Sequence, residues 1–144
     1  MIQRIQSLYL LIAILLAGMV SFLVPFWMGS EDEPVYLISL LQAGELSLKI
    51  VPAAFIVSAI LALWTLLSFK VRTKQIIYNR LNIVINFLLL GIVVYHQLNL
   101  PGEAVVSEKG IGVFIPLLII VFLALANKAI IKDDKLVKSV DRLR

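Results

Sequence analysis

The chain has 144 residues and a net charge of +4, with 61% of its residues hydrophobic and 15% charged. Soluble domains are nearer half apolar and a quarter charged, so a soluble fold of this size could not bury so much apolar surface. The absence of cysteine excludes disulfides, thiolate metal sites and a cysteine nucleophile. The composition predicts an all-α membrane protein that forms one integral domain over residues 1–144, with the lipid bilayer as its surroundings.

In chain order, four apolar runs are long enough to cross a membrane as helices. They cover residues 7–28, 50–69, 81–98 and 111–127. The first run could instead be a cleaved signal peptide, but it is longer than the apolar region of such a peptide. It also ends in bulky residues rather than in a small-residue cleavage site. We therefore expect a four-helix transmembrane bundle with up-down-up-down connections.

The loop between the first two runs is acidic and long for a simple connection. Polar and apolar residues alternate over 45–50, which is typical of a strand, so residues 35–50 are expected to form a short outer hairpin. A short helix over residues 35–42 that rests on the bilayer is the alternative. The acidic triplet Glu31-Asp32-Glu33 could attract a divalent cation, but three consecutive carboxylates need a special loop shape to converge on one ion. A solvated loop is the favoured interpretation, and we expect no metal and no cofactor.

Two of the runs carry a distinctive helical face. In the second run, small residues recur every three or four positions and predict a close approach to a neighbouring helix. They are Ala54, Ser58, Ala62 and Thr65. In the third run, Asn82 and Asn86 lie one turn apart and should point into the bundle, because amides exposed to lipid tails are costly. They could line a polar pathway, although a hydrogen bond to an adjacent helix is the favoured interpretation.

His96 is the only histidine of the chain and lies near the end of the third run. As a proton relay or ligand it would need a partner. The run holds no carboxylate, and the chain offers no second histidine and no cysteine. A polar residue at the membrane interface is therefore the favoured interpretation of His96.

The distribution of basic residues predicts the topology. The basic hairpin, residues 70–80, carries four positive charges and no negative one, and the tail, residues 128–144, carries six positive and three negative. With both termini and the hairpin in the cytoplasm, 11 of the 13 Lys and Arg residues lie inside, as the positive-inside rule requires. We expect this N-in, C-in orientation.

The tail has the pattern of an amphipathic helix at the inner membrane surface. Leu136, Val140 and Leu143 are spaced i, i+4, i+7, and Asp134 and Lys138 form a favourable i, i+4 pair. The tail acids could also tie the tail to the basic hairpin and so build a cytoplasmic face. The candidate acids are Asp133, Asp134 and Asp141, and the candidate bases are Arg72, Lys74 and Arg80.

Both ends of the chain carry a recognisable pattern: residues 1–11 read MIQRIQSLYLL and residues 133–144 read DDKLVKSVDRLR. Together with the four apolar runs and the basic hairpin, these ends resemble an uncharacterised family of small four-span membrane proteins from Bacteroidetes, defined as a domain of unknown function. The resemblance implies an inner-membrane location. It implies no activity, substrate or site residue.

No catalytic constellation, metal-ligand spacing or nucleotide motif appears in the sequence. Because no pair of groups for acid–base or nucleophilic chemistry lies within the runs, a membrane enzyme is the least favoured class. A non-enzymatic accessory or scaffold subunit, with other membrane proteins or a second copy as partners, is favoured. A small oligomeric transporter or channel comes second, because His96 and the amides are the only candidates for a polar pathway.

Overall fold

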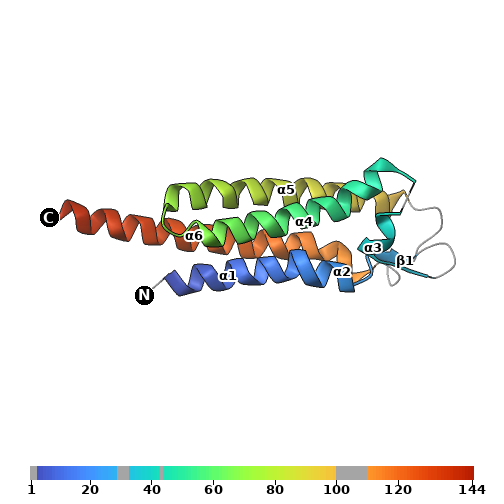
Figure 1. The fold of residues 1–144 in the computed structure, drawn as a ribbon, viewed down its shortest axis with the longest axis horizontal. Helices are drawn as coiled ribbons and strands as arrows, with labels where there is room; N and C mark the ends of the chain where they lie inside the picture. Colours follow the sequence, from blue (N-terminus) through green and yellow to red (C-terminus); the bar gives the residue numbers. More distant parts are fainter. Residues whose placement is uncertain (1–2, 29–32, 43, 100–109) are drawn as a thin grey trace.

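Four stretches of the chain are apolar over enough residues to form helices that satisfy their own backbone hydrogen bonds. The computed structural model describes residues 3–28, 33–42, 44–99 and 110–144. The four long helices lie side by side in an elongated up-down bundle (Figure 1). Each is long and apolar enough to span a membrane, which confirms the predicted fold class.

The helix bounds are as follows. The first rod consists of α1 (Gln3–Leu15), a π-helical turn η1 (Leu16–Val20) and α2 (Ser21–Leu23). The second and third rods are α4 (Leu46–Leu67) and α5 (Arg72–Leu98). The fourth consists of a 3₁₀ turn η3 (Ile111–Phe114) followed by α6 (Ile115–Arg142).

Each rod buries one stripe of residues spaced three or four positions apart, as helices packed side by side require. The stripes are Gln6, Leu10, Ala13 and Ala17 in the first rod; Val51, Phe55, Ser58, Ala62 and Thr65 in α4; Gln75, Asn79, Asn82, Asn86, Leu89 and Val93 in α5; and Ile115, Ile119, Leu123, Ala126, Ile130 and Asp133 in α6. The small-residue face predicted for the second run thus packs inside the bundle, with Ala54 half-buried at its edge. The outer faces expose large apolar side chains, as contact with lipid requires.

Short elements close one end of the bundle, which we call the loop end (residues 24–28, 33–42, 44–45 and 110–112). Here β1 (Trp27–Met28) pairs antiparallel with β2 (Pro34–Val35), and the short helix α3 (Leu37–Leu40) follows. The hairpin expected over residues 35–50 is therefore wrong, because residues 46–50 are the first turns of α4. The alternative, a helix over residues 35–42, is realised in part as α3. Alternation over only six residues is a weak signal. The long apolar run that follows forms a helix, and this helix begins at Leu46, within the alternating segment.

Phe26 and the neighbouring Pro25 connect the loop end to the start of the fourth rod through close packing and a hydrogen bond. The buried ring of Phe26 packs against Phe55 of α4, with ring centroids 5.5 Å apart. The backbone N–H of Gly112 donates to the carbonyl oxygen of Pro25 at 3.0 Å. A Cβ atom at Gly110 would overlap the Pro25 carbonyl, and one at Gly112 would lie 2.7 Å from the Phe26 ring. Glycine is therefore required at both positions for this close approach.

The predicted spans and the helices differ at several ends. The first span ends at Leu23 instead of residue 28, because Pro25 disfavours the helical conformation of the residue before it, and Val24 is extended. The second begins at Leu46, so Pro52 lies inside α4 rather than in its first turn. These ends were predicted from charge and apolarity, which do not mark where backbone hydrogen bonding starts.

The basic hairpin and the tail differ most from expectation. Residues 72–80 are the first turns of α5, so only residues 68–71 connect α4 to α5. No proline or glycine lies in residues 68–80 to stop a helix. The tail is helical as predicted, but it continues α6 without a break to Arg142 and projects along the bundle axis beyond the other helices (Figure 1). It does not form a separate helix turned onto the bundle's end.

Candidate functional site

The most polar part of the buried core is a row of four amides on α5, which we call the amide ladder: Gln75, Asn79, Asn82 and Asn86. The four positions are spaced i, i+4, i+7, i+11, so they lie on one helical face. At most 1% of each residue is exposed, which places all four in the bundle interior. Below them on the same face, Leu89 and Val93 continue the stripe with apolar side chains.

The ladder binds both neighbouring helices through hydrogen bonds. The side-chain amide of Asn82 donates to the backbone oxygen of Ser58 in α4 at 2.9 Å, and that of Asn86 donates to Ser58 Oγ at 2.8 Å. Asn86 also donates to Oδ1 of Asn82 at 3.0 Å. On the other side, Asn79 donates to the carbonyl oxygen of Leu123 in α6 at 2.7 Å. The ladder therefore joins α4, α5 and α6 in the middle of the bundle.

Three oxygens of the ladder have no hydrogen-bond partner: Gln75 Oε1, Asn79 Oδ1 and Asn86 Oδ1. Each lies in the protein interior, where an unpaired acceptor costs about 1–3 kcal/mol. Amides neither take up nor release protons near neutral pH, so the ladder can bind and orient groups but offers no acid–base chemistry. The amide ladder therefore joins helices by hydrogen bonds and retains three acceptor oxygens without a partner.

At the end of the ladder, Arg72 of α5 pairs with Asp133 of α6, with 3.0 Å between Nη2 and Oδ2. This is one of the contacts predicted between the basic hairpin and the tail. The side chains are only 21% and 11% exposed, so the pair lies largely within the protein. Asp133 also ends the buried stripe of α6, which explains why an acid occupies an otherwise apolar face.

The other predicted members of the cytoplasmic face do not form contacts between helices. Asp134 pairs with Lys138 at 2.7 Å within α6, as its spacing predicts. Lys74, Arg80 and Asp141 are exposed, and no ion pair joins them within the described ranges. The geometry therefore brings together one pair of the predicted set.

His96 lies far along α5 from the ladder, half-buried in the last turn of the helix. Its ring packs edge-on against Tyr95, with ring centroids 5.6 Å apart. Within residues 3–28, 33–42, 44–99 and 110–144, no group of three His, Asp or Glu side chains could hold a metal ion. Glu31 and Asp32 of the acidic triplet lie outside the described residues.

Gln75 and Asn79 were missed as members of the site, because residues 70–80 were predicted to be a connection. A signal was present, since three residues back from Asn82 is Asn79, and four residues back from Asn79 is Gln75. Applied across the basic hairpin, the same helical spacing would have identified the whole ladder. The partners Ser58 and Leu123 could not be chosen, because sequence spacing does not show which helices are neighbours.

The fold and the amide ladder define a class. The protein is a small integral membrane protein whose four apolar helices are joined by buried amides and by the Arg72–Asp133 ion pair. The chain belongs to the family described as a domain of unknown function, DUF4293, whose pattern matches residues 2–143. No curated protein and no solved structure matches it.

Proposed function

We propose that the protein is a non-enzymatic accessory or scaffold subunit of a membrane complex in the inner membrane of a Bacteroidetes bacterium, with both termini in the cytoplasm. The observation that carries this proposal is the projecting end of α6. A helix that extends beyond its own bundle presents a surface which the bundle does not use.

The projecting segment has two different faces. Leu136, Val137 and Val140 form an apolar stripe and are 44%, 40% and 60% exposed. Asp134, Lys138 and Asp141 lie on the opposite side of the helix. An amphipathic helix with an uncovered apolar stripe is a common form of protein docking element. The mixed signs of its charges favour a protein partner over a purely polybasic lipid anchor.

The membrane-embedded part supports a structural role. Its buried polar groups are amides and hydroxyls, which hold neighbouring helices at about 0.6–2 kcal/mol for each hydrogen bond. Enzymes need positioned acids, bases or nucleophiles. The described part of the core contains one buried carboxylate, Asp133, and Arg72 neutralises it.

The experiment is purification from native membranes in mild detergent, with co-purifying proteins identified and quantified. The wild type should carry a stoichiometric membrane partner, and L136S/V140S should lose it while unfolding at the same temperature. The matched control is D141S/R142S, which changes the opposite face and leaves the net charge unchanged. The proposal fails if the wild type purifies alone, or if both double variants retain the partner.

A second function, a small oligomeric transporter or channel, is favoured by one observation: the three ladder oxygens without partners. Spare acceptors inside a membrane bundle are what a polar solute or cation would use. A homo-oligomer without other proteins, together with solute flux in vesicles that is lost in N79L, would support this function instead. A stoichiometric partner and no flux would support the subunit.

A further inference from the structure

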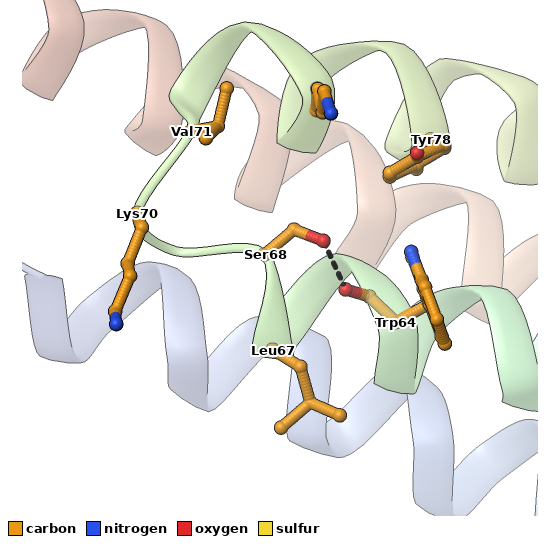
Figure 2. Close-up of a pocket in the computed structure, with 7 residues that line it drawn as sticks. Trp64, Leu67, Ser68, Lys70, Val71 and Tyr78 are labelled. Carbon is orange, nitrogen blue, oxygen red and sulfur yellow. Dashed lines mark hydrogen bonds between the residues drawn. The ribbon is translucent and has the colours of Figure 1, made fainter.

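A groove lies at the connection between α4 and α5, and its lining combines positively charged side chains with aromatic and aliphatic ones. It has a volume of about 350 Å³, within the range of about 300–1,000 Å³ that is typical of small-molecule sites. Its lining residues are Trp64, Leu67, Ser68, Lys70, Val71, Lys74 and Tyr78. Figure 2 shows Trp64 reaching from α4 and Tyr78 from α5, whereas the Lys70 side chain extends from the connection away from both. We call this hollow the interfacial groove.

The charge of the interfacial groove is uncompensated. Lys70 and Lys74 are its charged residues, and no acid lines it. Within the described residues, the two ion pairs of this region, Arg72–Asp133 and Asp134–Lys138, involve neither lysine. A pair of exposed ammonium groups without a protein counter-ion is complementary to an anionic ligand.

The rest of the lining places that anion at the membrane boundary. Trp64 and Leu67 are 58% and 62% exposed and belong to the outer face of the transmembrane helix α4. Trp and Tyr are enriched where a helix leaves the hydrocarbon region and meets headgroups. The groove therefore has a cationic part, at the connection, and an apolar part that runs onto the lipid-facing surface.

We propose that the interfacial groove binds the headgroup of an anionic phospholipid. Lys74 contacts the phosphate, Lys70 adds positive charge at the edge of the groove, and the Tyr78 side chain lies beside the headgroup. The acyl chains extend along Trp64 and Leu67. A water-soluble anion would use the two lysines but leave the aromatic and aliphatic part of the groove uncovered, whereas a lipid covers both. This ligand site is separate from the partner surface on α6.

Trp64 provides a direct probe of the bound lipid, because the chain contains only two tryptophans and the other is Trp27 at the loop end. In the W27F variant, tryptophan fluorescence reports on Trp64 alone. The protein is reconstituted in phosphatidylcholine vesicles in which brominated phosphatidylglycerol or brominated phosphatidylcholine is present at the same mole fraction. We expect the anionic brominated lipid to quench Trp64 more strongly. Removing one lysine should weaken this preference about fivefold.

The variants K70Q and K74Q, alone and combined, test the site. The matched control is K132Q/K135Q, which removes two exposed positive charges at the same end of the bundle, outside the groove. The preference should be lost in K70Q/K74Q and kept in the control. Equal quenching by the two brominated lipids, or equal loss in both double variants, would overturn the proposal. Loss of the preference in millimolar inorganic phosphate would also overturn it, because the ligand would then be a soluble anion.

A second measurement does not depend on the W27F substitution. Native mass spectrometry of the full chain, released from phosphatidylglycerol-containing membranes in mild detergent, should show a retained anionic lipid on the wild type and on K132Q/K135Q. The K70Q/K74Q protein should lose it while showing the same helical circular dichroism. Retention of the lipid by K70Q/K74Q contradicts the assignment.

Discussion

Arg72 and Asp133 join the first turn of α5 to the cytoplasmic part of α6 proposed above, with 3.0 Å between Nη2 and Oδ2. Arg72 is the first residue of α5, and α6 continues for nine residues beyond Asp133 to Arg142. The pair therefore ties the last buried position of α6 to the start of α5. The ion pair links the stability of the bundle to the position of its proposed docking surface.

Replacing either member of this pair should destabilise the fold. The R72Q variant leaves the Asp133 carboxylate largely buried without its partner, and D133N leaves the guanidinium without its counter-ion. Leaving one member of a largely buried ion pair without its partner costs about 1–3 kcal/mol or more, so each variant should lower the free energy of unfolding by roughly that amount. The measurement is unfolding in mixed micelles with increasing sodium dodecyl sulfate.

The control for this prediction is the exposed pair between Lys138 and Asp134, which has the same chemistry without the burial. K138Q should change the free energy of unfolding by less than about 0.5–1 kcal/mol. The R72Q/D133N double variant should be less destabilised than the sum of the single variants, because the double variant leaves no charge unpaired. Additive losses would mean that the two side chains do not interact.

The hydrogen bond from Asn86 to Ser58 predicts a measurable coupling between α5 and α4. N86L and S58A should each reduce stability, and a double-mutant cycle should give a coupling energy of about 0.6–2 kcal/mol. Leu88, two residues along and 65% exposed, provides the matched position on the outer face. L88A should be nearly neutral and should not couple to S58A. A coupling energy near zero for N86L and S58A would show that the ladder does not hold these helices together.

Helical spacing allowed the inner faces to be predicted, and charge allowed the positions of the connections to be predicted approximately. Asn82 and Asn86 were placed inside, because amides in lipid are costly, and the small-residue face of α4 was recognised from its spacing. The ion pair was included among several possible pairings. Choosing Arg72 with Asp133 required knowing that α5 and α6 are adjacent at that height, which is a property of packing and not of spacing.

The errors share one physical origin, which is that charge marks the membrane boundary and not the helix boundary. Lys74 and Arg80 are compatible with helix, so α5 starts nine residues before the predicted span at 81. The same holds for α6, where the charges after Asn127 do not interrupt the backbone hydrogen bonds. At the loop end, the strand pairing of Trp27 with Val35 had no short-range signal, since it joins segments on either side of an acidic loop.

The close approach of Phe26 to the start of the fourth rod predicts that Gly110 and Gly112 cannot carry a side chain. In G112A the new methyl group meets the Phe26 ring, and in G110A it meets the Pro25 backbone. Overpacking of this kind costs about 1–3 kcal/mol, and G110A should be the more damaging because backbone yields less than a ring. Gly91 has no neighbour within 4 Å of an added Cβ atom, so G91A should be neutral or slightly stabilising. Thermal unfolding in detergent compares the three variants, and equal midpoints would contradict the contact.

The proposed orientation can be tested with single cysteines, because the chain contains none. G44C places a thiol at the loop end with no atom within 4 Å of its Cβ, and K135C places one on the exposed part of the projecting helix. If positive residues are retained in the cytoplasm, a membrane-impermeant maleimide should label G44C in intact cells. It should label K135C only after the inner membrane is permeabilised. The reverse pattern would place the projecting end of α6 in the periplasm, where a partner that binds Leu136 and Val140 would then have to lie.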